Sequence, residues 1–548
     1  MRLRLDRWKV GIIILTLLFA IPVIVVFSSI FYGTGDAWAH LVDTVLADYI
    51  SNSLILMLGV SVGTLSMGIT TAWLTSICEF PGRKIFQWAL LLPLAVPAYI
   101  IAYTYTGMFD FAGPVQTALR ELFGWGARDY WFPEIRSIGG AITMLSLVLY
   151  PYVYLLTRAA FLEQSSVTLE ASRSLGMGPW KSFFNVALPM ARPAIITGLS
   201  LALMETLADF GTVEYFGVST FTTGIFRTWF GLGDATAASQ LASLLLVFVF
   251  VLIMMERYSR RRARFHQQIG RQAHAQRIQL TPAKAWLAFI ACLLPLLFGF
   301  LLPFMQLATW AVETAGEMIN SDFFDLVFHS LSLAIATSLI ALLLALFMAY
   351  GQRLHDNPFM RLMVRTASMG YAIPGTVIAI GVVIPFAWLD NSIDDWSSSQ
   401  FDYSTGLLFS GTLFALVFSY LVRFLAVSVG TVESSLGKIK PSMDDAARSM
   451  GVKSFQVLRR IHIPIMRTSL LTALLLVFVD ILKELPATLL LRPFNFNTLA
   501  VRAYELAADE RLADASSAAI MIVLVGILPV ILLSFSITQN RYEVINKK

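Results

Sequence analysis

Residues 170–176 read Glu-Ala-Ser-Arg-Ser-Leu-Gly, and residues 445–451 read Asp-Ala-Ala-Arg-Ser-Met-Gly. The two stretches align when the chain is shifted by 275 positions, and the alignment continues without a gap from residue 170 to residue 192. Further upstream, a shift of 277 places Pro97 on Pro374. A repeat of this length indicates that one structural unit occurs twice in the chain.

The composition around this repeat is that of a membrane protein. Of the 548 residues, 57% are hydrophobic and 14% are charged, whereas soluble domains carry about 25% charged residues. The apolar residues form twelve blocks, most of them long enough and poor enough in charge to cross a bilayer as helices. The blocks lie near residues 10–30, 52–77, 85–108, 138–157, 193–212, 239–256, 285–310, 330–352, 366–388, 406–429, 468–488 and 515–538. We therefore predict an all-α polytopic membrane protein whose twelve transmembrane helices form two parallel six-helix repeats.

The basic residues predict the orientation of these helices. The loops on one side of the membrane contain only seven basic residues, namely Arg120, Arg128, Arg136, Arg227, Arg492, Arg502 and Arg511. Because Lys and Arg concentrate on the cytoplasmic side, we expect the opposite side, with both termini, to be cytoplasmic in a cell inner membrane. The outer loops also hold 21 Asp and Glu residues. These could attract a cation, or could simply reflect the exclusion of basic residues from this side.

The repeat divides the chain into two halves of six spans. The N-terminal half covers residues 1–256, a basic cytoplasmic linker covers 257–284, and the C-terminal half covers 285–548. The Arg residues of the linker are expected to contact lipid headgroups rather than nucleic acid. Parallel duplication predicts a pathway between the halves, and Pro97 and Pro374 are predicted to kink corresponding spans.

The repeated motif lies in two predicted cytoplasmic loops, residues 165–190 and 438–465. Each loop is predicted to form a short helix, a glycine that ends this helix in a left-handed conformation, and a second helix closed by a proline before the next span. Two such helices across the cytoplasmic face would offer a rigid docking surface. His462, in the second loop, is expected to be a surface contact rather than a ligand.

At these residues the sequence resembles the inner-membrane permeases of binding-protein-dependent ABC importers, whose EAA loop fits a groove of a cytoplasmic ATPase. The resemblance implies the type I importer permease fold and two ATPase copies, which bind ATP and Mg²⁺, with no cofactor in this chain. Ser172, Val186, Asp445 and Ile463 depart mildly from the family pattern. The docking residues that the resemblance implies are Glu170, Ala171, Gly176, Leu188, Pro189, Asp445, Ala446, Gly451, Ile463 and Pro464.

Residues 205–217 and 482–494 are similar to the ferric-iron branch of these importers. This similarity implies Fe³⁺ as the substrate, delivered by a periplasmic ferric-iron-binding protein. Thiamine, sulfate and phosphonate permeases share the architecture and remain alternatives. An ion-coupled secondary transporter and a membrane receptor or scaffold are rivals from other classes.

Four carboxylates interrupt the fifth and eleventh spans. Glu205 and Asp209 are four residues apart, and the 275-residue shift places them on Asp480 and Glu484, so each pair is predicted to share a helix face. A charge at the bilayer centre costs about 2.5–3.5 kcal/mol, so these groups should face water or protein. With Lys483, which could neutralise one carboxylate or keep the path closed to stray cations, they are candidates for the translocation path. They could contact a hard trivalent ion, or form salt bridges between helices.

Other candidate groups are weaker, and the metal-ligand set stays unknown. Tyr103, Tyr105, Tyr150, Tyr152 and Tyr154 could supply phenolate oxygens or belong to an interfacial aromatic belt. The sequence contains no phosphate-binding loop and no hydrolase motif. We therefore predict a subunit that is not an enzyme, with ATP hydrolysed by a separate protein.

Overall fold

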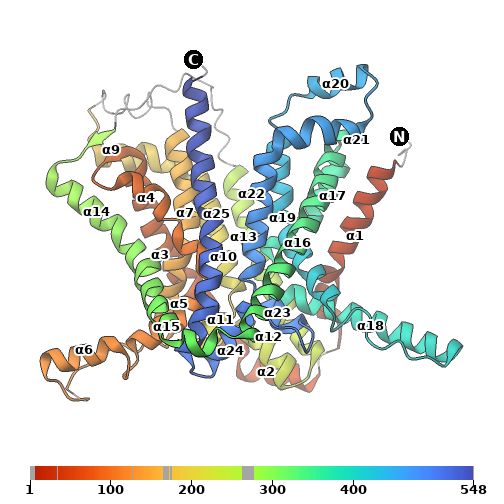
Figure 1. The fold of residues 1–548 in the computed structure, drawn as a ribbon, viewed down its shortest axis with the longest axis horizontal. Coiled ribbons are helices and arrows are strands. Elements are labelled where there is room, and N and C mark those ends of the chain that lie inside the picture. Colours follow the sequence, from red (N-terminus) through yellow and green to blue (C-terminus); the bar gives the residue numbers. More distant parts are fainter. Residues whose placement is uncertain are drawn as a thin grey trace.

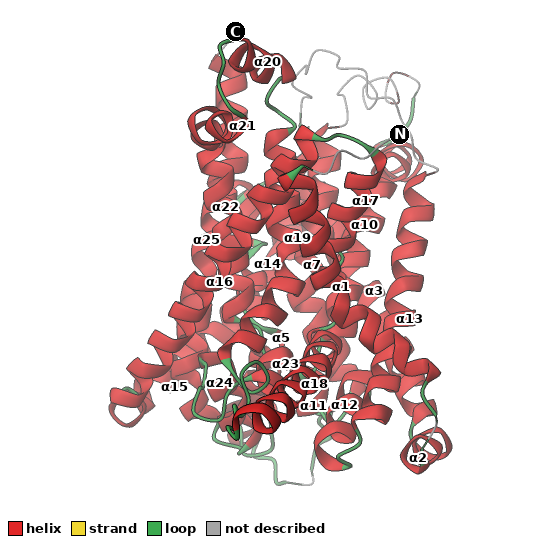
Figure 2. Cartoon of the chain, turned by 90° about the vertical axis from the view of Figure 1, so that its right-hand side faces the viewer, coloured by secondary structure: helices red, strands yellow, loops and turns green. Residues whose placement is uncertain are grey.

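The structure is a computed structural model that describes residues 6–33, 35–127, 129–163, 172, 174, 176–261 and 277–546. The described part consists almost entirely of helices that run between two ends of the molecule (Figure 1). One end, here called the terminal face, carries the start of α1 and the end of α25, together with α9, α20 and α21 (Figures 1 and 2). The opposite face carries α2, α6 and α24.

Each half contributes a similar series of helices, in which η marks a 3₁₀- or π-helical segment. The N-terminal half contains α1 (Arg7–Ser28), η1 (Ser29–Phe31), α2 (Asp36–Thr44), α3 (Leu46–Ile77), α4 (Arg83–Ala89), η2 (Leu92–Ala95), α5 (Ala98–Phe109), α6 (Pro114–Phe123), α7 (Ile138–Glu163), α9 (Pro179–Ser182), η3 (Phe183–Ala187), α10 (Leu188–Ala208), α11 (Gly211–Tyr215), α12 (Phe221–Phe226), η4 (Arg227–Gly231) and α13 (Ala235–Arg261).

The C-terminal half follows the same order. It contains α14 (Pro282–Leu296), η5 (Leu297–Leu301), α15 (Leu302–Met318), α16 (Ser321–Leu354), α17 (Pro358–Ala367), η6 (Gly370–Ala372), α18 (Gly375–Phe401), α19 (Leu413–Leu436), α20 (Pro441–Ser449), α21 (Ser454–Val457), η7 (Leu458–His462), α22 (Ile463–Leu482), α23 (Pro486–Leu491), α24 (Leu499–Ala508) and α25 (Leu512–Asn546).

The helices confirm the predicted number of membrane spans. Eleven helices of the described residues are long and apolar enough to cross a bilayer. A bent pair of helical segments, Arg83–Ala95 and Ala98–Phe123, meets at an angle of 90° and makes a twelfth span if the two segments cross together. The count of twelve, in two corresponding sets, agrees with the two-repeat fold class.

Both predicted proline kinks are present, and they have nearly identical backbones. Pro97 has φ −58° and ψ 141° and precedes α5, whereas Pro374 has φ −55° and ψ 141° and precedes α18. Proline disfavours the helical conformation for the residue before it, so each chain breaks at this point and starts a new helix. The break therefore belongs to the repeated unit.

Small residues allow the closest helix pair to pack. α3 and α7 lie side by side, with Gly59, Gly63 and Gly68 of α3 against α7. An added Cβ at Gly63 would overlap Ser146, and one at Gly68 would overlap Val153. Because lipid is as apolar as these side chains, such close approach, rather than exclusion of water, holds membrane helices together.

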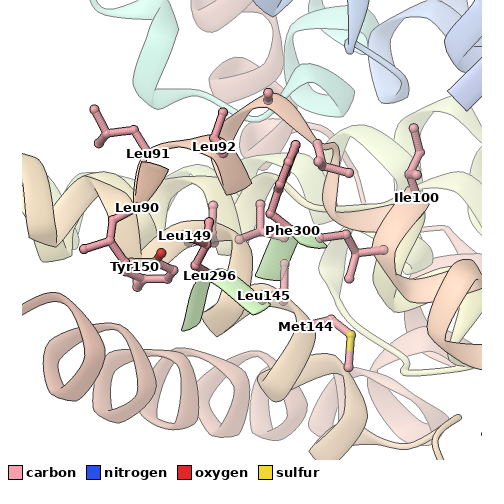
Figure 3. Packing of buried hydrophobic residues seen from close by; sticks show 14 of the residues in the cluster. Leu90, Leu91, Leu92, Ile100, Met144, Leu145, Leu149, Tyr150, Leu296 and Phe300 are labelled. Carbon is pink, nitrogen blue, oxygen red and sulfur yellow. The ribbon is translucent and has the colours of Figure 1, made fainter. Parts of the chain in front are cut away.

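The end helices of each half pack against the other half. α1 contacts α17 and α18, while α14 contacts α3 and α4, and α25 contacts η2 and α5. The N-terminal core accordingly includes Leu296 and Phe300 of the second half, next to Leu149 and Tyr150 of α7 (Figure 3). The two halves are therefore interlocked through their end helices.

A two-residue parallel ladder fixes the end of the linker. β1 (Cys78–Glu79) pairs with β2 (Ile278–Gln279), and Arg277 lies 3.2 Å from a carboxylate oxygen of Glu79. α13 continues to Arg261, and residues 262–276 of the predicted linker lie outside the described part. The ladder brings the chain back to the N-terminal half before α14 begins.

Candidate functional site

The repeated motif of the C-terminal half forms a helix that ends on a left-handed glycine. Gly451, with φ 79°, follows α20. The N–H of Gly451 donates to the carbonyl of Arg448 at 2.9 Å, and the N–H of Val452 donates to that of Ala447 at 3.0 Å. These two bonds satisfy carbonyls at the helix end that otherwise lack partners. The predicted role of the glycine is confirmed.

The N-terminal copy ends in the same way. Gly176 also has φ 79°, and the N–H of Met177 donates to the carbonyl of Ser172 at 3.1 Å, the pair that corresponds to Val452 and Ala447. Glu170 and Ala171, the first residues of this copy, lie outside the described residues. The equivalence of the two turns shows that the repeat in sequence is a repeat in structure.

The prediction that a proline closes the second helix of each motif before the next span is wrong at both Pro189 and Pro464. Residues Ser454–Leu482 form one continuous helical run, in which η7 joins α21 to Ile463 and Pro464, the first residues of α22. In the N-terminal copy, η3 likewise joins α9 to α10, which begins with Leu188 and Pro189. A proline inside an α-helix clashes with the carbonyl four residues earlier, and the wider π-helical turn accommodates it. Each second helix therefore runs directly into its span.

The second helix of each motif, α9 in the first half and α21 in the second, carries an exposed aromatic ring at a corresponding position. Trp180, 74% exposed, and Phe455, 62% exposed, are paired by the 275-residue shift. Asp445 and Ala446, on α20, are also exposed. Aromatic side chains are enriched in protein interfaces, so Trp180 and Phe455 are candidates for contact with another protein.

Beneath this surface, a buried ionic network holds α20 on the bundle. Oδ1 of Asp444 lies 2.7 Å from Nε2 of His462, and Nε of Arg353 donates to Oδ2 of Asp444 at 2.8 Å. Arg353 also donates to the carbonyl of Ile439 at 2.9 Å. His462 is fully buried, so the expectation of a surface contact is wrong.

The charges around Asp444 oppose the effect of its burial. Burial by itself would raise the pKa of the Asp444 carboxyl, but hydrogen bonds from Arg353 and His462, together with their charges, hold that pKa below its ordinary value. The N-terminal half has no such network in its sequence, because the repeat places Leu169, Ala187 and Ser76 at these positions. There, the hydroxyls of Ser172 and Ser182 lie 2.8 Å apart.

The intramembrane carboxylates lie at two helix ends rather than along two helix faces. α10 ends at Ala208, so Glu205 is helical while Asp209 is already extended. α22 ends at Leu482, so Asp480 is helical while Glu484 lies beyond the helix. The prediction that each pair shares one helix face is therefore wrong. Both spans break at the point where their second carboxylate occurs.

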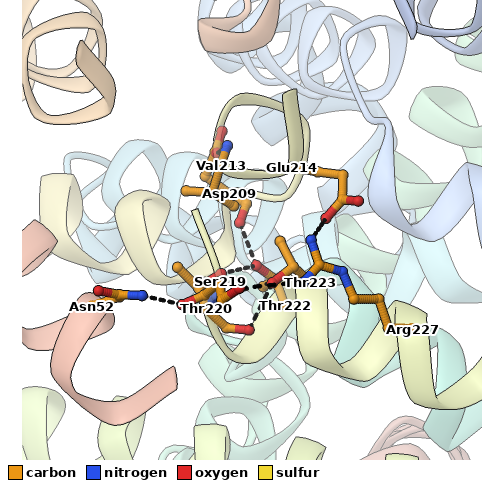
Figure 4. Close-up of polar contacts among 9 residues, drawn as sticks. All are labelled: Asn52, Asp209, Val213, Glu214, Ser219, Thr220, Thr222, Thr223 and Arg227. Atoms are coloured by element: carbon orange, nitrogen blue, oxygen red, sulfur yellow. Dashed lines mark hydrogen bonds and ion pairs between the residues drawn. The ribbon is translucent and has the colours of Figure 1, made fainter. Parts of the chain in front are cut away.

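Asp209 uses its oxygens to start the next short helix. Its Oδ2 accepts from the N–H groups of Thr212 and Val213, each at 3.1 Å, and its Oδ1 accepts from the hydroxyl of Thr212 at 2.9 Å. The hydroxyl of Thr222 donates to the Asp209 carbonyl at 2.7 Å (Figure 4). Asp209 thus ties the broken span to α11 and α12.

The second pair is held by two cations of the same half. Nη1 of Arg423, on α19, lies 2.7 and 2.6 Å from the two oxygens of Glu484, and Lys483 lies 2.8 Å from Asp480. Nη2 of Arg423 also lies 4.0 Å from Glu205, which belongs to the other half. Lys483 is thus paired with one carboxylate, as the first of its two expected roles requires, and salt bridges account for most of the buried charge.

These groups line a cavity of about 110 Å³ between the halves. Its walls include the four carboxylates, Arg423 and Lys483, together with Tyr99, Tyr152 and Tyr371. The four carboxylates and two cations give the wall a negative formal charge. Such a wall can hold a cation better than an anion.

Among the predicted tyrosines, Tyr152 alone lines this cavity. Tyr103 and Tyr150 are buried in the N-terminal core. The hydroxyl of Tyr105 donates to the carbonyl of Phe298 at 2.5 Å. The hydroxyl of Tyr154 donates to the carbonyl of Gln87 at 3.0 Å. These four pack inside the protein and do not form an interfacial belt. The described residues contain no cluster of His, Cys, Asp and Glu able to enclose a metal ion.

Comparison with known proteins identifies the family. The family model for the inner membrane component of binding-protein-dependent transport systems matches residues 65–265 and 341–540, once in each half. The chain belongs to this family. The permease is thus a multi-pass membrane protein built from two copies of the family unit.

Several relatives resemble the permease over most of its length. The Fe(3+)-transport system permease protein FbpB 2 of Haemophilus influenzae is 25% identical over 496 residues, which cover 89% of this chain and 90% of that protein. The ferric transport system permease protein FbpB of Actinobacillus pleuropneumoniae is 22% identical over 89% of this chain and 72% of its own. The molybdenum transport system permease protein ModB of Escherichia coli is 33% identical over 28% of this chain and 64% of its own.

Sequence reasoning missed three residues of the permease that organise these sites. Arg423 lies in the apolar block of residues 406–429, and a charge at that depth requires a partner, which the sequence does not reveal. Gly375, which follows Pro374, leaves room for Arg423 and Glu484, whose side chains an added Cβ would overlap. Asp444 was missed because the repeat alignment begins at its neighbour, the motif residue Asp445. The sequence did carry a signal for Gly375: the residue directly after the repeated proline is alanine (Ala98) in the first half but glycine in the second.

Proposed function

We propose that this chain is the membrane-spanning subunit of an ATP-driven importer that moves Fe³⁺ from a periplasmic binding protein to the cytoplasm by alternating access. Support comes from the relatives named for ferric transport, which match nearly the whole chain. Two copies of a separate ATPase, carrying ATP and Mg²⁺, dock on the terminal face, which is cytoplasmic together with both chain termini. The binding protein docks on the opposite face.

One observation carries this proposal: each docking element and one wall of the cavity are the two ends of a single helical run. Ser454–Leu482 contains 29 residues, which at about 1.5 Å per residue span about 43 Å. This run begins beside α20 and ends at Lys483 and Glu484. Trp180–Ala208 connects the N-terminal element to Asp209 in the same way. A movement of the ATPases would therefore reach both walls of the cavity directly.

The charge of the cavity favours a cationic substrate over two of the alternatives. Sulfate and phosphonate are anions, and a wall with four carboxylates and two cations would repel them. Thiamine carries a positive charge, so the wall does not discriminate against it. The distinction between Fe³⁺ and thiamine thus rests on the binding protein that delivers the substrate.

A reconstituted complex tests this function. The chain is purified with its ATPase, inserted into lipid vesicles and supplied with iron-loaded or iron-free binding protein. We expect the iron-loaded form to stimulate ATP hydrolysis and iron uptake. Stimulation by a thiamine-loaded binding protein but not by the iron-loaded one would contradict the proposed substrate.

The coupling to an ATPase has its own test. The double variant Glu170→Lys with Asp445→Lys should abolish uptake while the permease remains folded, because both docking surfaces then carry the wrong charge. An ion-coupled secondary transporter would retain uptake in this variant. A receptor or scaffold would show no stimulated hydrolysis even in the unaltered complex.

A further inference from the structure

The four carboxylates of the cavity differ in how far their oxygens are already occupied. Asp209, Asp480 and Glu484 each accept hydrogen bonds or form close ion pairs. Glu205 receives no hydrogen bond from any residue that the structure describes, and its side chain is 28% exposed. Glu205 is therefore the carboxylate of this wall whose oxygens are available to another group.

The cations of the cavity all belong to one half. Arg423 and Lys483 both lie in the C-terminal half, whereas the repeat places Val148 and Ala208 at these positions in the N-terminal half. The C-terminal wall therefore carries two carboxylates and two cations. The N-terminal wall carries two carboxylates with no cation of its own.

Among the charged groups of the cavity, the two walls are joined through the weaker contact of Arg423. Nη1 of Arg423 approaches Glu484 of its own half to 2.6 Å, whereas Nη2 approaches Glu205 of the other half only to 4.0 Å. Nε of Arg423 is buried and makes no hydrogen bond within the described part of the chain. If the halves move apart, as the proposed alternating access requires, the shorter contact keeps Arg423 with Glu484, and Glu205 loses its nearest cation.

We propose that Glu205 is the carboxylate that contacts the transported cation, and that Arg423 is its counter-ion while the halves are together. This inference rests on the proposed function and names the residues that serve it. Separation of the halves exposes Glu205 to the incoming cation. Their return brings Arg423 back to Glu205, and the repulsion between two cations at one carboxylate drives the substrate onward.

The role of Glu205 is tested in the reconstituted complex with iron-loaded binding protein. In Glu205→Gln, iron uptake per ATP hydrolysed should fall about tenfold or more, while stimulated hydrolysis persists, because the docking surfaces are unchanged. The matched control is Asp356→Asn, which neutralises an exposed carboxylate paired with Arg361 away from the cavity. Wild-type uptake in Glu205→Gln, or an equal loss in the control, would overturn the proposal.

The role of Arg423 is tested with the permease alone in vesicles, which needs neither iron nor the ATPase. Arg423→Met is combined with Glu484→Met, so that no partner of the buried pair is left charged. A pH-sensitive dye inside the vesicles should report a proton leak several-fold above wild type, and adding Glu205→Gln should remove the leak. An absent leak, or one unaffected by Glu205→Gln, would overturn the counter-ion role. A wild-type complex that imports no iron would instead contradict the proposed function.

Discussion

Nε2 of His462 lies 2.7 Å from Oδ1 of Asp444, and both side chains are buried directly beneath the exposed Asp445. The two neighbouring carboxylates of α20 therefore differ in exposure, as expected for adjacent residues of a helix, which point about 100° apart. Asp444 fixes the helix on the bundle through His462 and Arg353, whereas Asp445 is left exposed. In the proposed docking of the ATPase on Asp445, the stability of α20 and its recognition by a partner would rest on different residues.

The first prediction compares these two carboxylates. Asp444→Asn should lower the free energy of unfolding by about 1–3 kcal/mol, because it leaves the partly buried Arg353 without its counter-charge. Asp445→Asn should leave this free energy unchanged and weaken binding of the ATPase. Thermal unfolding of the purified protein and co-purification of the ATPase measure the two effects. Equal loss of stability in both variants would contradict the assigned orientation of the two groups.

The second prediction concerns pH. The pKa of Asp444 is lower in the folded protein than its ordinary value of about 3.9, so its ionised form stabilises the fold at pH values above that range. This contribution is lost as the pH falls through the folded-state pKa. The difference in unfolding temperature between wild type and Asp444→Asn should therefore be constant above about pH 5 and shrink below about pH 4. A difference that does not shrink at all as the pH falls below about 4 would exclude an electrostatic origin.

The third prediction concerns the space left by Gly375. Gly375→Ala should destabilise the protein by about 1–3 kcal/mol and reduce uptake, because the new methyl group overlaps Glu484 and Arg423. Gly316→Ala in α15 is the matched control, since an added Cβ there meets no atom within 4 Å. That control should gain about 0.5–1 kcal/mol, as expected for glycine replaced by alanine inside a helix. Thermal unfolding and iron uptake distinguish the two variants.

The fourth prediction concerns the helix ends that form the cavity. Asp209→Ala removes three hydrogen bonds at the start of α11 and should cost about 1 kcal/mol. The double variant Asp209→Asn with Glu484→Gln should impair iron uptake, because it removes one carboxylate from each wall, without affecting ATPase docking. Uptake at the wild-type rate would show that these two carboxylates serve structure alone.

Patterns that depend on neighbouring residues were readable from the sequence. Long apolar blocks gave the spans, and the repeat gave the matched glycine turns at Gly176 and Gly451 as well as the breaks at Pro97 and Pro374. Each of these features is local, since the conformation of a glycine turn or a proline break is set within a few residues.

Contacts between side chains that are distant along the chain could not be predicted from the sequence. The partner of Arg423 comes from a segment 61 residues away, and that of His462 becomes evident only when α20 folds back over the bundle. The helix faces of Glu205 and Glu484 were mispredicted because a four-residue spacing implies a shared face only while the helix continues. The continuation of α22 through Pro464 required a π-helical turn, which no pattern in the sequence indicated.

The interlocked end helices also constrain how the chain is made. α1 packs against α17 and α18, which lie more than 300 residues further along the chain. At a synthesis rate of about 5–20 residues per second, the newly inserted α1 waits on the order of 20–70 s for these neighbours to emerge. Biogenesis of the first six spans therefore remains unfinished until the second set enters the bilayer.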